Sequence, residues 1–488
     1  MDTNLLDPDF ADLLDRPALV ARAPTAEEEA PDQAALATFA RLVLRAAAGG
    51  EPSQPARLLI ETFIAEIDLA MNAQINAILH APEFQALEAS WRGLWMLARA
   101  TDRELGCKVK VFNIGKRELS RTLRKFRGAA WDQSPIFKRI YEEEYGQFGG
   151  EPFGLLVGDY GFDHRPDDVA LISDMAKIAA AAHAPFIAMA EPALMQMESW
   201  AEVANPRDLT RLFRTPEYVS WQAMREQEDT RYVGLCMPRF LLRLPYGPNT
   251  DPLDAFALDE ETEGDGYDKL LWGNPAFAFA SNVARAFVEY GWCVRIRGID
   301  RGGVVSGLPV LHHPTADGDT DRRTVTEICL SERREGELSS CGLIPLVHRK
   351  SSDVAAFLSA QSLQKPKSYQ DDDATMNATL SARLPYLFAC CRFAHYLKCM
   401  VRDKIGSTLT RAQLEQWLSD WLMTYDDGSP ATSTEDFKAQ HPLSDAQVFI
   451  TQREDEPGMY DARFFLQPHY QLEGLSVALR LVSRLAVQ

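Results

Sequence analysis

The stretch FGLLVGDYGFDHRPDDVALISDMAKIAAAAHAPFIAMA, residues 153–190, indicates the fold class. Its two ends, FGLLVGDY (153–160) and PFIAMA (185–190), are short apolar runs with the length and composition of buried strands. Between them, residues 172–182 are rich in alanine, the strongest helix former, and predict a helix. KVKVFN, residues 108–113, is a further strand candidate. The alternation of apolar strands and helices predicts an α/β mixed (α+β) core.

Long helices are predicted before this stretch. Residues 55–80 repeat apolar side chains near the 3.6-residue period of an amphipathic helix. Pro82 breaks that helix, and another helix follows that carries Leu87, Trp91, Leu94 and Trp95. We place the start of the folded core at residue 55.

The first fifty residues differ from the rest of the chain. Asp7 and Pro8 fit the cap and the first position of a short helix, and Pro17 ends it. An acid- and proline-rich linker follows at 23–33, and then a second small helix at 34–48. A helix this short either folds back on its own domain or docks on another protein, and the linker favours docking. The apolar side of the first helix includes Leu6, Phe10, Leu13 and Leu14.

The C-terminal part begins after a polar junction at Gln370. Helices are expected at 384–404 and 414–423. The closing sequence LSVALRLVSRL, residues 475–485, alternates apolar with other residues, which predicts a strand with one apolar face. That face is expected to contain Leu475, Val477, Leu479 and Leu481. A strand at a chain end is an edge candidate and can pair with a neighbouring molecule.

A chain of 488 residues is too long for one ordinary core, so two or three domains are expected. We divide it into an N-terminal helical arm at 1–54, a core at 55–372 and a C-terminal domain at 373–488. The C-terminal domain is expected to end in the edge strand.

The charge balance disfavours two classes of partner. The formal net charge is −19, from 70 acidic residues against 51 Lys and Arg, which disfavours nucleic acid and anionic lipid. The basic segment 116–127 is expected to be a solvated helix face or a docking face for an acidic protein. No run of about 18 apolar residues exists, and the N-terminus lacks a signal-peptide pattern. We therefore expect a cytoplasmic protein without direct membrane insertion.

The best candidate for a catalytic site is GDYGFDHRPDD, residues 158–168. Asp159, His164 and Asp168 are possible metal ligands, and a metal-dependent hydrolase is the alternative hypothesis that they support. Their spacing matches no helical metal motif, and a strand end followed by a turn explains the stretch more simply. We predict no catalytic residue, no metal site and no cofactor.

Other residues of types that often serve catalysis or ligand binding are expected to have structural roles. RGIDRGGVVSGLP, residues 297–309, matches neither a P-loop nor GxGxxG, so its glycines are expected at tight turns or close backbone contacts. His183 and His395 lie in apolar surroundings, as core histidines do. The eight cysteines include no CxxC pair and are expected to be reduced thiols. The acidic segment 257–268 is expected to be an exposed loop.

Long strings of the sequence match a known family in order and spacing, from about residue 60 to the end. They include FQALEASWRGLW (84–95), EEEYGQFGGEPFGLLVGDY (142–160), REQEDTRYVGLCMPRFLLRLPYG (225–247), TEICLSERREGELSSCGLIPLVH (326–348), ARLPYLFACCRFAHYLKCMVRDKIGS (382–407) and FFLQPHYQLEGLSVALRLVS (464–483). In these strings the chain closely resembles the TssC (VipB) family, the large sheath subunit of type VI secretion. So many long strings in order are more specific than any short motif.

The resemblance implies a multi-domain contractile tail-sheath-like fold without a catalytic group. It implies a small-subunit partner, TssB (VipA), whose heterodimers with the large subunit stack as helical rings around a tube of Hcp protein. Each heterodimer also contacts other sheath heterodimers. Assembly of the sheath starts at a baseplate, and contraction propels the tube and its spike out of the cell. The ClpV ATPase then disassembles the contracted sheath.

The resemblance also assigns roles to the two ends of the chain. In related sheaths, terminal strands exchange between neighbours, which makes residues 474–485, with Leu475, Val477, Leu479 and Leu481, the expected mesh strand. ClpV engages an N-terminal helix of the large subunit. The candidates are the helix at 34–48 and the first helix, with Leu6, Phe10, Leu13 and Leu14.

The chain departs from the family pattern at few positions. Gly161 stands where the family usually has Glu, Asp300-Arg301 interrupts a usual glycine run, and the first fifty residues match only loosely. A third hypothesis is a sheath of another phage-tail-like injector, which genomic neighbourhood would distinguish.

Overall fold

The computed structural model describes residue 41 and residues 56–486, apart from residues 102–105, 205–207, 249, 254–255, 263–268, 315–319, 405–409, 430–431, 453–458 and 470–478. It divides into two compact units, which are described separately below. Of the described residues, the smaller unit comprises 41, 56–78, 253 and 256–259, and the larger unit comprises the remainder. The first predicted helix lies outside the described residues, as does the second apart from residue 41.

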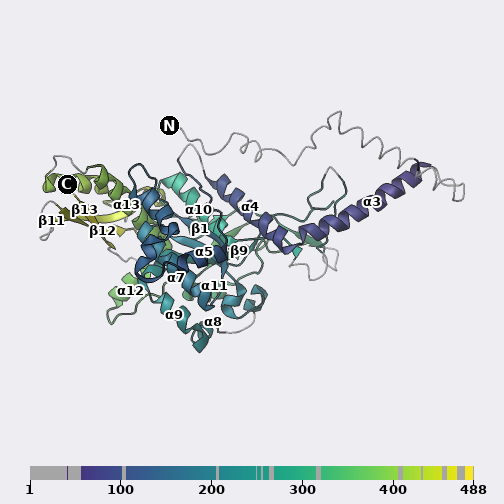
Figure 1. The fold of residues 1–488 in the computed structure, drawn as a ribbon, viewed down its shortest axis with the longest axis horizontal. Helices are drawn as coiled ribbons and strands as arrows, with labels where there is room; N and C mark the ends of the chain where they lie inside the picture. The colour runs from purple at the N-terminus through teal and green to yellow at the C-terminus, as the bar shows by residue number, and fades with distance from the viewer. Residues whose placement is uncertain are drawn as a thin grey trace. The chain divides into compact units, whose positions relative to one another are not determined.

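A six-stranded sheet forms the centre of the larger unit (Figure 1). The first four strands pair in parallel, and the last two add antiparallel. The helix α7 (Pro166–Ala182) connects the first strand to the second, which confirms the strand–helix–strand prediction for 153–190. In order across the sheet, the strands are β1 (Leu156–Phe162), β2 (Phe186–Ala190), β3 (Val233–Met237), β9 (Leu343–His348), β10 (Ala355–Phe357) and β6 (Val304–Val305).

Helices cover both faces of this sheet, as buried parallel strands require. Along β2, Phe186 and Ala188 contribute to one apolar core, while Ile187 between them contributes to the other. The first core contains side chains of α7 and of α9 (Val219–Arg225), and the second contains side chains of α10 (Pro275–Tyr290) and α13 (Leu384–Asp403). The period of two along the strand thus separates the two cores.

The remaining elements surround this centre. The helices are α4 (Pro82–Ala100), α5 (Lys116–Arg124), α6 (Pro135–Phe137), α8 (Leu209–Leu212), α11 (Glu332–Ser340), α12 (Asp372–Ser381), α14 (Arg411–Met423) and α15 (Glu435–Gln440), with a π-helix at Lys138–Gly146. Two small antiparallel pairs join β4 (Phe240–Leu241) to β5 (Trp272–Gly273), and β7 (His312–Pro314) to β8 (Thr320–Arg322). In the smaller unit, α3 (Ala56–Leu79) matches the helix predicted at 55–80.

A second sheet lies near the C-terminus. It consists of β11 (Leu443–Gln452), β12 (Met459–Pro468) and β13 (Leu479–Ala486), all antiparallel. One face carries alternating buried residues of β11 and β12, among them Val448 and Phe464, which pack against α13 and α14. The other face of β11 is exposed, so the sheet is covered by helices on one side.

Gly93 is the point of close approach between α4 and α10. A Cβ atom at this position would overlap the ring of Phe277, with its Cε2 and Cγ atoms at 2.8 and 2.9 Å. Leu97, one turn along α4, packs into the same apolar cluster as Phe277. Only glycine therefore allows the two helices this separation.

We expect Gly93→Ala to lower the free energy of unfolding by about 1–3 kcal/mol, because overpacking a tight contact displaces the ring or the helix. Thermal unfolding of purified protein measures this. Ala98→Leu is the matched control, since Ala98 lies on an exposed part of the same helix and should shift stability by less than about 0.5 kcal/mol. Equal effects of the two substitutions would show that the helices do not meet at Gly93.

The structure confirms the prediction about the glycines of 297–309 and contradicts the prediction of a strand at 108–113. In the segment 297–309, Gly302 has a positive φ of +83°, and a Cβ on Gly303 would overlap the carbonyl oxygen of Phe357. Glycine at turns and close contacts is thus confirmed there. In contrast, the strand predicted at 108–113 is wrong as a paired strand, because these residues join no sheet of the described chain.

Candidate assembly surfaces

The residues of the predicted metal alternative have separate partners. Asp159 accepts a hydrogen bond from Asn274 Nδ2 at 3.1 Å, while Asp168 pairs with Lys116 Nζ at 2.8 Å. The Nδ1 atom of His164 lies 2.9 Å from a main-chain carbonyl of the short helix after β2. Among the described residues, no group of three His, Cys, Asp or Glu side chains is placed to hold a metal ion. The geometry thus gives the hydrolase hypothesis no support.

The basic segment 116–127 is mainly an intramolecular contact, which the sequence did not indicate. Its helix, α5, buries Leu119 and Leu123 and forms ion pairs with the acidic side of α7. The pairs join Lys116 to Asp168 at 2.8 Å, Arg124 to Asp167 at 2.8 Å and Arg127 to Asp174 at 2.7 Å. Much of the positive charge is therefore neutralised within the chain.

His395 is a core histidine, as predicted. Its side chain is buried, its Nε2 atom lies 2.9 Å from the carbonyl oxygen of Ala182, and its ring packs edge-on against Tyr145. No described group bonds to its Nδ1 atom, so a proton on that atom would be buried without a partner. Burial lowers the pKa of His395 to about 3, and it lowers the pKa of the neighbouring His183 to about 4.

These shifts predict acid sensitivity. An unfolded histidine binds a proton near pH 6.5, whereas His395 and His183 remain neutral in the folded chain, so stability falls as the pH drops below about 6.5. We expect His395→Phe to reduce the slope of unfolding free energy against pH by up to about 1.4 kcal/mol per pH unit between pH 6 and 4. Urea unfolding at a series of pH values measures it. An unchanged slope would mean that His395 is protonated in the folded state.

The eight cysteines are free thiols, and Cys236, Cys341, Cys390 and Cys391 are buried. Burial raises the pKa of each of these four thiols. A thiol with a raised pKa is a poor nucleophile, so these groups act as small apolar side chains.

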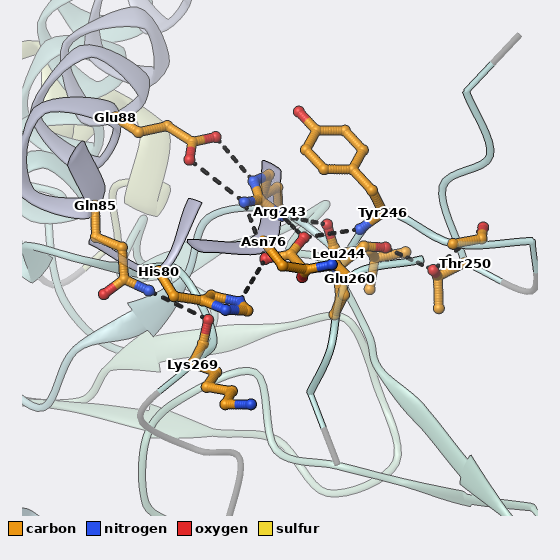
Figure 2. A network of polar contacts seen from close by, with 12 residues as sticks. Asn76, His80, Gln85, Glu88, Arg243, Leu244, Tyr246, Thr250, Glu260 and Lys269 are labelled. Carbon is orange, nitrogen blue, oxygen red and sulfur yellow. Dashed lines mark hydrogen bonds and ion pairs between the residues drawn. The ribbon is translucent and has the colours of Figure 1, made fainter. Parts of the chain in front are cut away.

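Arg243 is the centre of a buried ionic network (Figure 2). Its guanidinium donates to Glu260 at 2.5 and 3.2 Å and to Glu88 at 2.8 Å, and Glu260 also accepts the main-chain N–H of Tyr246 at 2.9 Å. Side-chain exposure is 6% for Arg243 and 2% for Glu260. Glu260 lies in the acidic segment 257–268, so the prediction of an exposed loop is wrong at this residue because Arg243 compensates its charge.

The network fixes the position of α4, which carries Glu88. Burial alone would lower the pKa of Arg243, but the two carboxylates outweigh it and raise that pKa. Burial likewise raises the pKa of Glu88, and hydrogen bonds from Arg243 and Arg92 more than reverse this effect. Both groups are therefore held in their charged forms at neutral pH.

The outer face of α4 is an exposed apolar stripe. Phe84, Leu87, Trp91 and Trp95 follow one side of the helix at helical spacing and are 36–55% exposed. The opposite side is covered by α10 through Gly93 and Leu97. Large exposed aromatic side chains on a fixed helix are typical of a protein–protein interface. We call this set the α4 stripe.

The smaller unit contains a helix with little cover. Within the part of α3 whose side chains are described, large apolar residues are exposed on several sides. The polar contacts of this helix inside the unit join Asn76 and Asn72 to the main chain of Asp259, at 2.9 and 3.2 Å. The exposed apolar residues are Ile64, Ile67, Leu69, Met71 and Ile78.

The predicted C-terminal mesh strand falls partly within β13. Leu479 lies opposite Leu466 of β12, and Leu481 lies opposite Phe464. Leu475 and Val477 lie outside the described residues, as do Leu6, Phe10, Leu13 and Leu14 of the predicted ATPase contact. Among the described helices, none has the length and apolar character needed to cross a membrane.

Two family models match most of the chain. The first is the EvpB/VC_A0108 tail sheath N-terminal domain, over residues 61–364, and the second is the EvpB/VC_A0108 tail sheath gpW/gp25-like domain, over residues 373–485. The type VI secretion system sheath protein TssC1 of Pseudomonas aeruginosa is 58% identical over 426 residues, which cover 87% of this chain and 86% of that protein.

Solved structures of a sheath tail protein, a baseplate and a contracted sheath are more distantly similar. A sheath tail protein from Desulfitobacterium hafniense is 11% identical, with a TM-score of 0.28 and coverage of 64% of this chain and 60% of that chain. A chain of the anti-feeding prophage baseplate is 11% identical, with a TM-score of 0.34 over 79% and 80% of the two chains. The contracted anti-feeding prophage sheath is 13% identical, with a TM-score of 0.25 over 66% and 65%.

Proposed function

The chain belongs to the EvpB/VC_A0108 tail sheath family, and from this membership we propose that it is the large subunit of a type VI secretion contractile sheath. On this proposal it pairs with the small subunit, TssB (VipA), and the heterodimers build a tubule around the Hcp tube. Contraction of the tubule propels the tube and spike out of the cell. The high identity to a TssC1 sheath protein over most of both chains carries the proposal.

Two exposed apolar surfaces support pairing with another subunit. The α4 stripe presents Trp91 and Trp95, and α3 exposes Ile64, Ile67 and Leu69 within its own unit. Each surface would be costly to leave in water, at about 25 cal/mol per Å² of apolar area. A partner chain that covers these helices would recover that free energy. We assign these surfaces to the small subunit.

The two ends of the chain are the proposed sites of contact with neighbouring heterodimers and with the ATPase that disassembles the sheath. We propose that residues 474–485, with Leu475, Val477, Leu479 and Leu481, link neighbouring heterodimers by strand exchange, since strand pairing uses main-chain hydrogen bonds. The helix with Leu6, Phe10, Leu13 and Leu14 is the proposed ClpV contact. Assembly would take place in the cytoplasm, from a baseplate.

No catalytic role is proposed, because a sheath can store its energy in the contacts of two lattice states. Surface ion pairs exchange partners at modest cost, about 0–1 kcal/mol each, whereas close-packed cores resist repacking. The many exposed ion pairs of this chain, such as Lys365–Glu226 and Lys367–Glu228, are of the kind that can exchange.

Co-expression with the candidate small subunit, followed by electron microscopy, tests the proposal. We expect tubules with a central channel and a stable heterodimer on size-exclusion chromatography. Expression of this chain alone is the matched control and should give no tubules. Only soluble monomers in the co-expressed sample would contradict the proposed function.

A further inference from the structure

The segment Lys108–Asn113 pairs with no strand of the described residues. Its sequence, KVKVFN, is rich in residues that favour strands, and its charged and apolar side chains alternate at first. Yet none of its main-chain N–H or C=O groups forms a hydrogen bond to another described residue. A local preference that the fold leaves unsatisfied is a common sign of a functional site.

Side-chain contacts hold this segment in place. Lys108 Nζ pairs with Glu151 at 2.6 Å and Lys110 Nζ pairs with Glu144 at 2.5 Å. Side chains two positions apart thus reach the same neighbouring stretch, 144–151, which is the period of an extended chain. At the far end, the Tyr160 hydroxyl donates to the carbonyl oxygen of Ile114 at 2.6 Å. The segment is therefore ordered before any partner arrives, which lowers the entropic cost of binding.

The other side of the segment is open and apolar. Val109 is 36% exposed and Val111 is 68% exposed, and Phe112, which follows on the lysine side, is 53% exposed. Edge strands that avoid pairing usually present free lysines to solvent. Here Lys108 and Lys110 are each paired with a carboxylate, of Glu151 and Glu144, so that their charge is partly offset.

We propose that residues 108–113 form a docking edge for an extended strand of the small sheath subunit. This rests on the proposed function, and it adds the mode of recognition: main-chain hydrogen bonds along the edge, with apolar side chains beside Val109 and Val111. The segment follows the α4 stripe closely in the chain, and Cys107 packs in the cluster of Leu97 and Phe277 beneath α4. One partner that covers the stripe can thus continue onto the edge.

The required partner strand has a defined chemistry. It spans about 20 Å, the length of six extended residues, and carries apolar side chains at alternate positions. Its charges are not specified by this edge, since both lysines already have acidic partners.

Hydrogen exchange tests the proposal directly. In the isolated chain, we expect the amides of residues 109–113 to exchange at close to the rate of an unfolded peptide, and in the purified heterodimer at least 100-fold more slowly. If the wild-type chain fails to pair with the small subunit, the proposed function is wrong. If it pairs while these amides still exchange fast, only the docking edge is wrong. Protection that appears only in tubules would assign the edge to a second copy of this chain and would overturn the proposed occupant.

Val111→Pro provides the matched genetic test, with Val111→Thr as control. Proline removes an N–H that has no described partner, so the thermal stability of the isolated chain should change little. Pairing with the small subunit should weaken at least tenfold for proline and by less than threefold for threonine, which keeps both the N–H and the strand preference. Equal pairing by both variants would contradict the proposal.

Discussion

Arg243→Leu is expected to lower the free energy of unfolding by about 3–5 kcal/mol, because it leaves the buried carboxylate of Glu260 without its main counter-charge and removes one of the two arginines that pair with Glu88. Glu260 would be the more affected, since its side chain is only 2% exposed and Arg243 provides both of its closest charged contacts. Glu88 would keep Arg92, whose Nε atom lies 2.7 Å away. Denaturant unfolding of the purified variant measures the loss.

The control for this prediction is an exposed ion pair of similar chemistry. Arg139 pairs with Glu143 at 3.3 Å, with both side chains more than half exposed, so Arg139→Leu should cost less than about 1 kcal/mol. The double variant Arg243→Leu with Glu260→Gln should recover part of the loss, because it removes the buried negative charge. If Arg243→Leu costs no more than Arg139→Leu, the network does not contribute to stability as described.

Deletion of residues 474–488 is expected to abolish tubules while heterodimers still form. β13 pairs with β12 at eight positions, from Met459 opposite Ala486 to Leu466 opposite Leu479. Under the proposed strand exchange, the same main-chain groups would bind a neighbour, so the deletion removes the link between heterodimers. Electron microscopy scores tubules, and co-purification with the small subunit scores pairing.

Single substitutions separate loss of the strand from loss of chain length. Leu481→Pro removes an N–H within β13 and should reproduce the deletion, whereas Gln488→Pro lies beyond the end of β13 at Ala486 and should assemble normally. Tubules formed by the deletion variant would refute the assignment of this strand to the lattice. Loss of the heterodimer as well would show that the strand has a role in folding or pairing instead.

The strand–helix–strand unit at 153–190 was predictable because the pattern of buried apolar residues in each segment is the one typical of its strand or helix. Phe186 and Ile187 are adjacent in β2 and contribute to different cores. A strand that is buried on both faces needs apolar residues at successive positions, which is why it reads as a short apolar run. The helix α13 was predictable for the same reason, since its buried apolar residues recur over several turns. The helix α3 was predictable from its apolar period alone, because the residues that carry this period, such as Ile64 and Ile67, are exposed in the described structure. An apolar period therefore predicts the type of element, and it predicts burial only where another element of the chain covers the apolar side.

The contacts that fix the proposed surfaces were not predictable from the sequence. Arg243 lies 17 residues from Glu260 and 155 from Glu88, and no local pattern links an arginine to acids at such separations. An arginine inside the apolar run FLLRLPY was the one available signal, because a buried charge requires a partner. Residues 108–113 show the opposite case: the local preference for a strand was evident, but no strand of the described residues pairs with them.

The fit of Phe277 against Gly93 also bears on how the chain carries load. A slide of α4 along α10 by one helical turn, about 5.4 Å, would bring Ala89 or Leu97 to the position of Gly93. Either side chain would collide with the ring, since even a single Cβ at Gly93 overlaps it. Force applied to the outer side of α4 therefore cannot be dissipated by slippage between the two helices. Under the proposed sheath function, force on α4 would instead be transmitted through the Phe277 ring to α10.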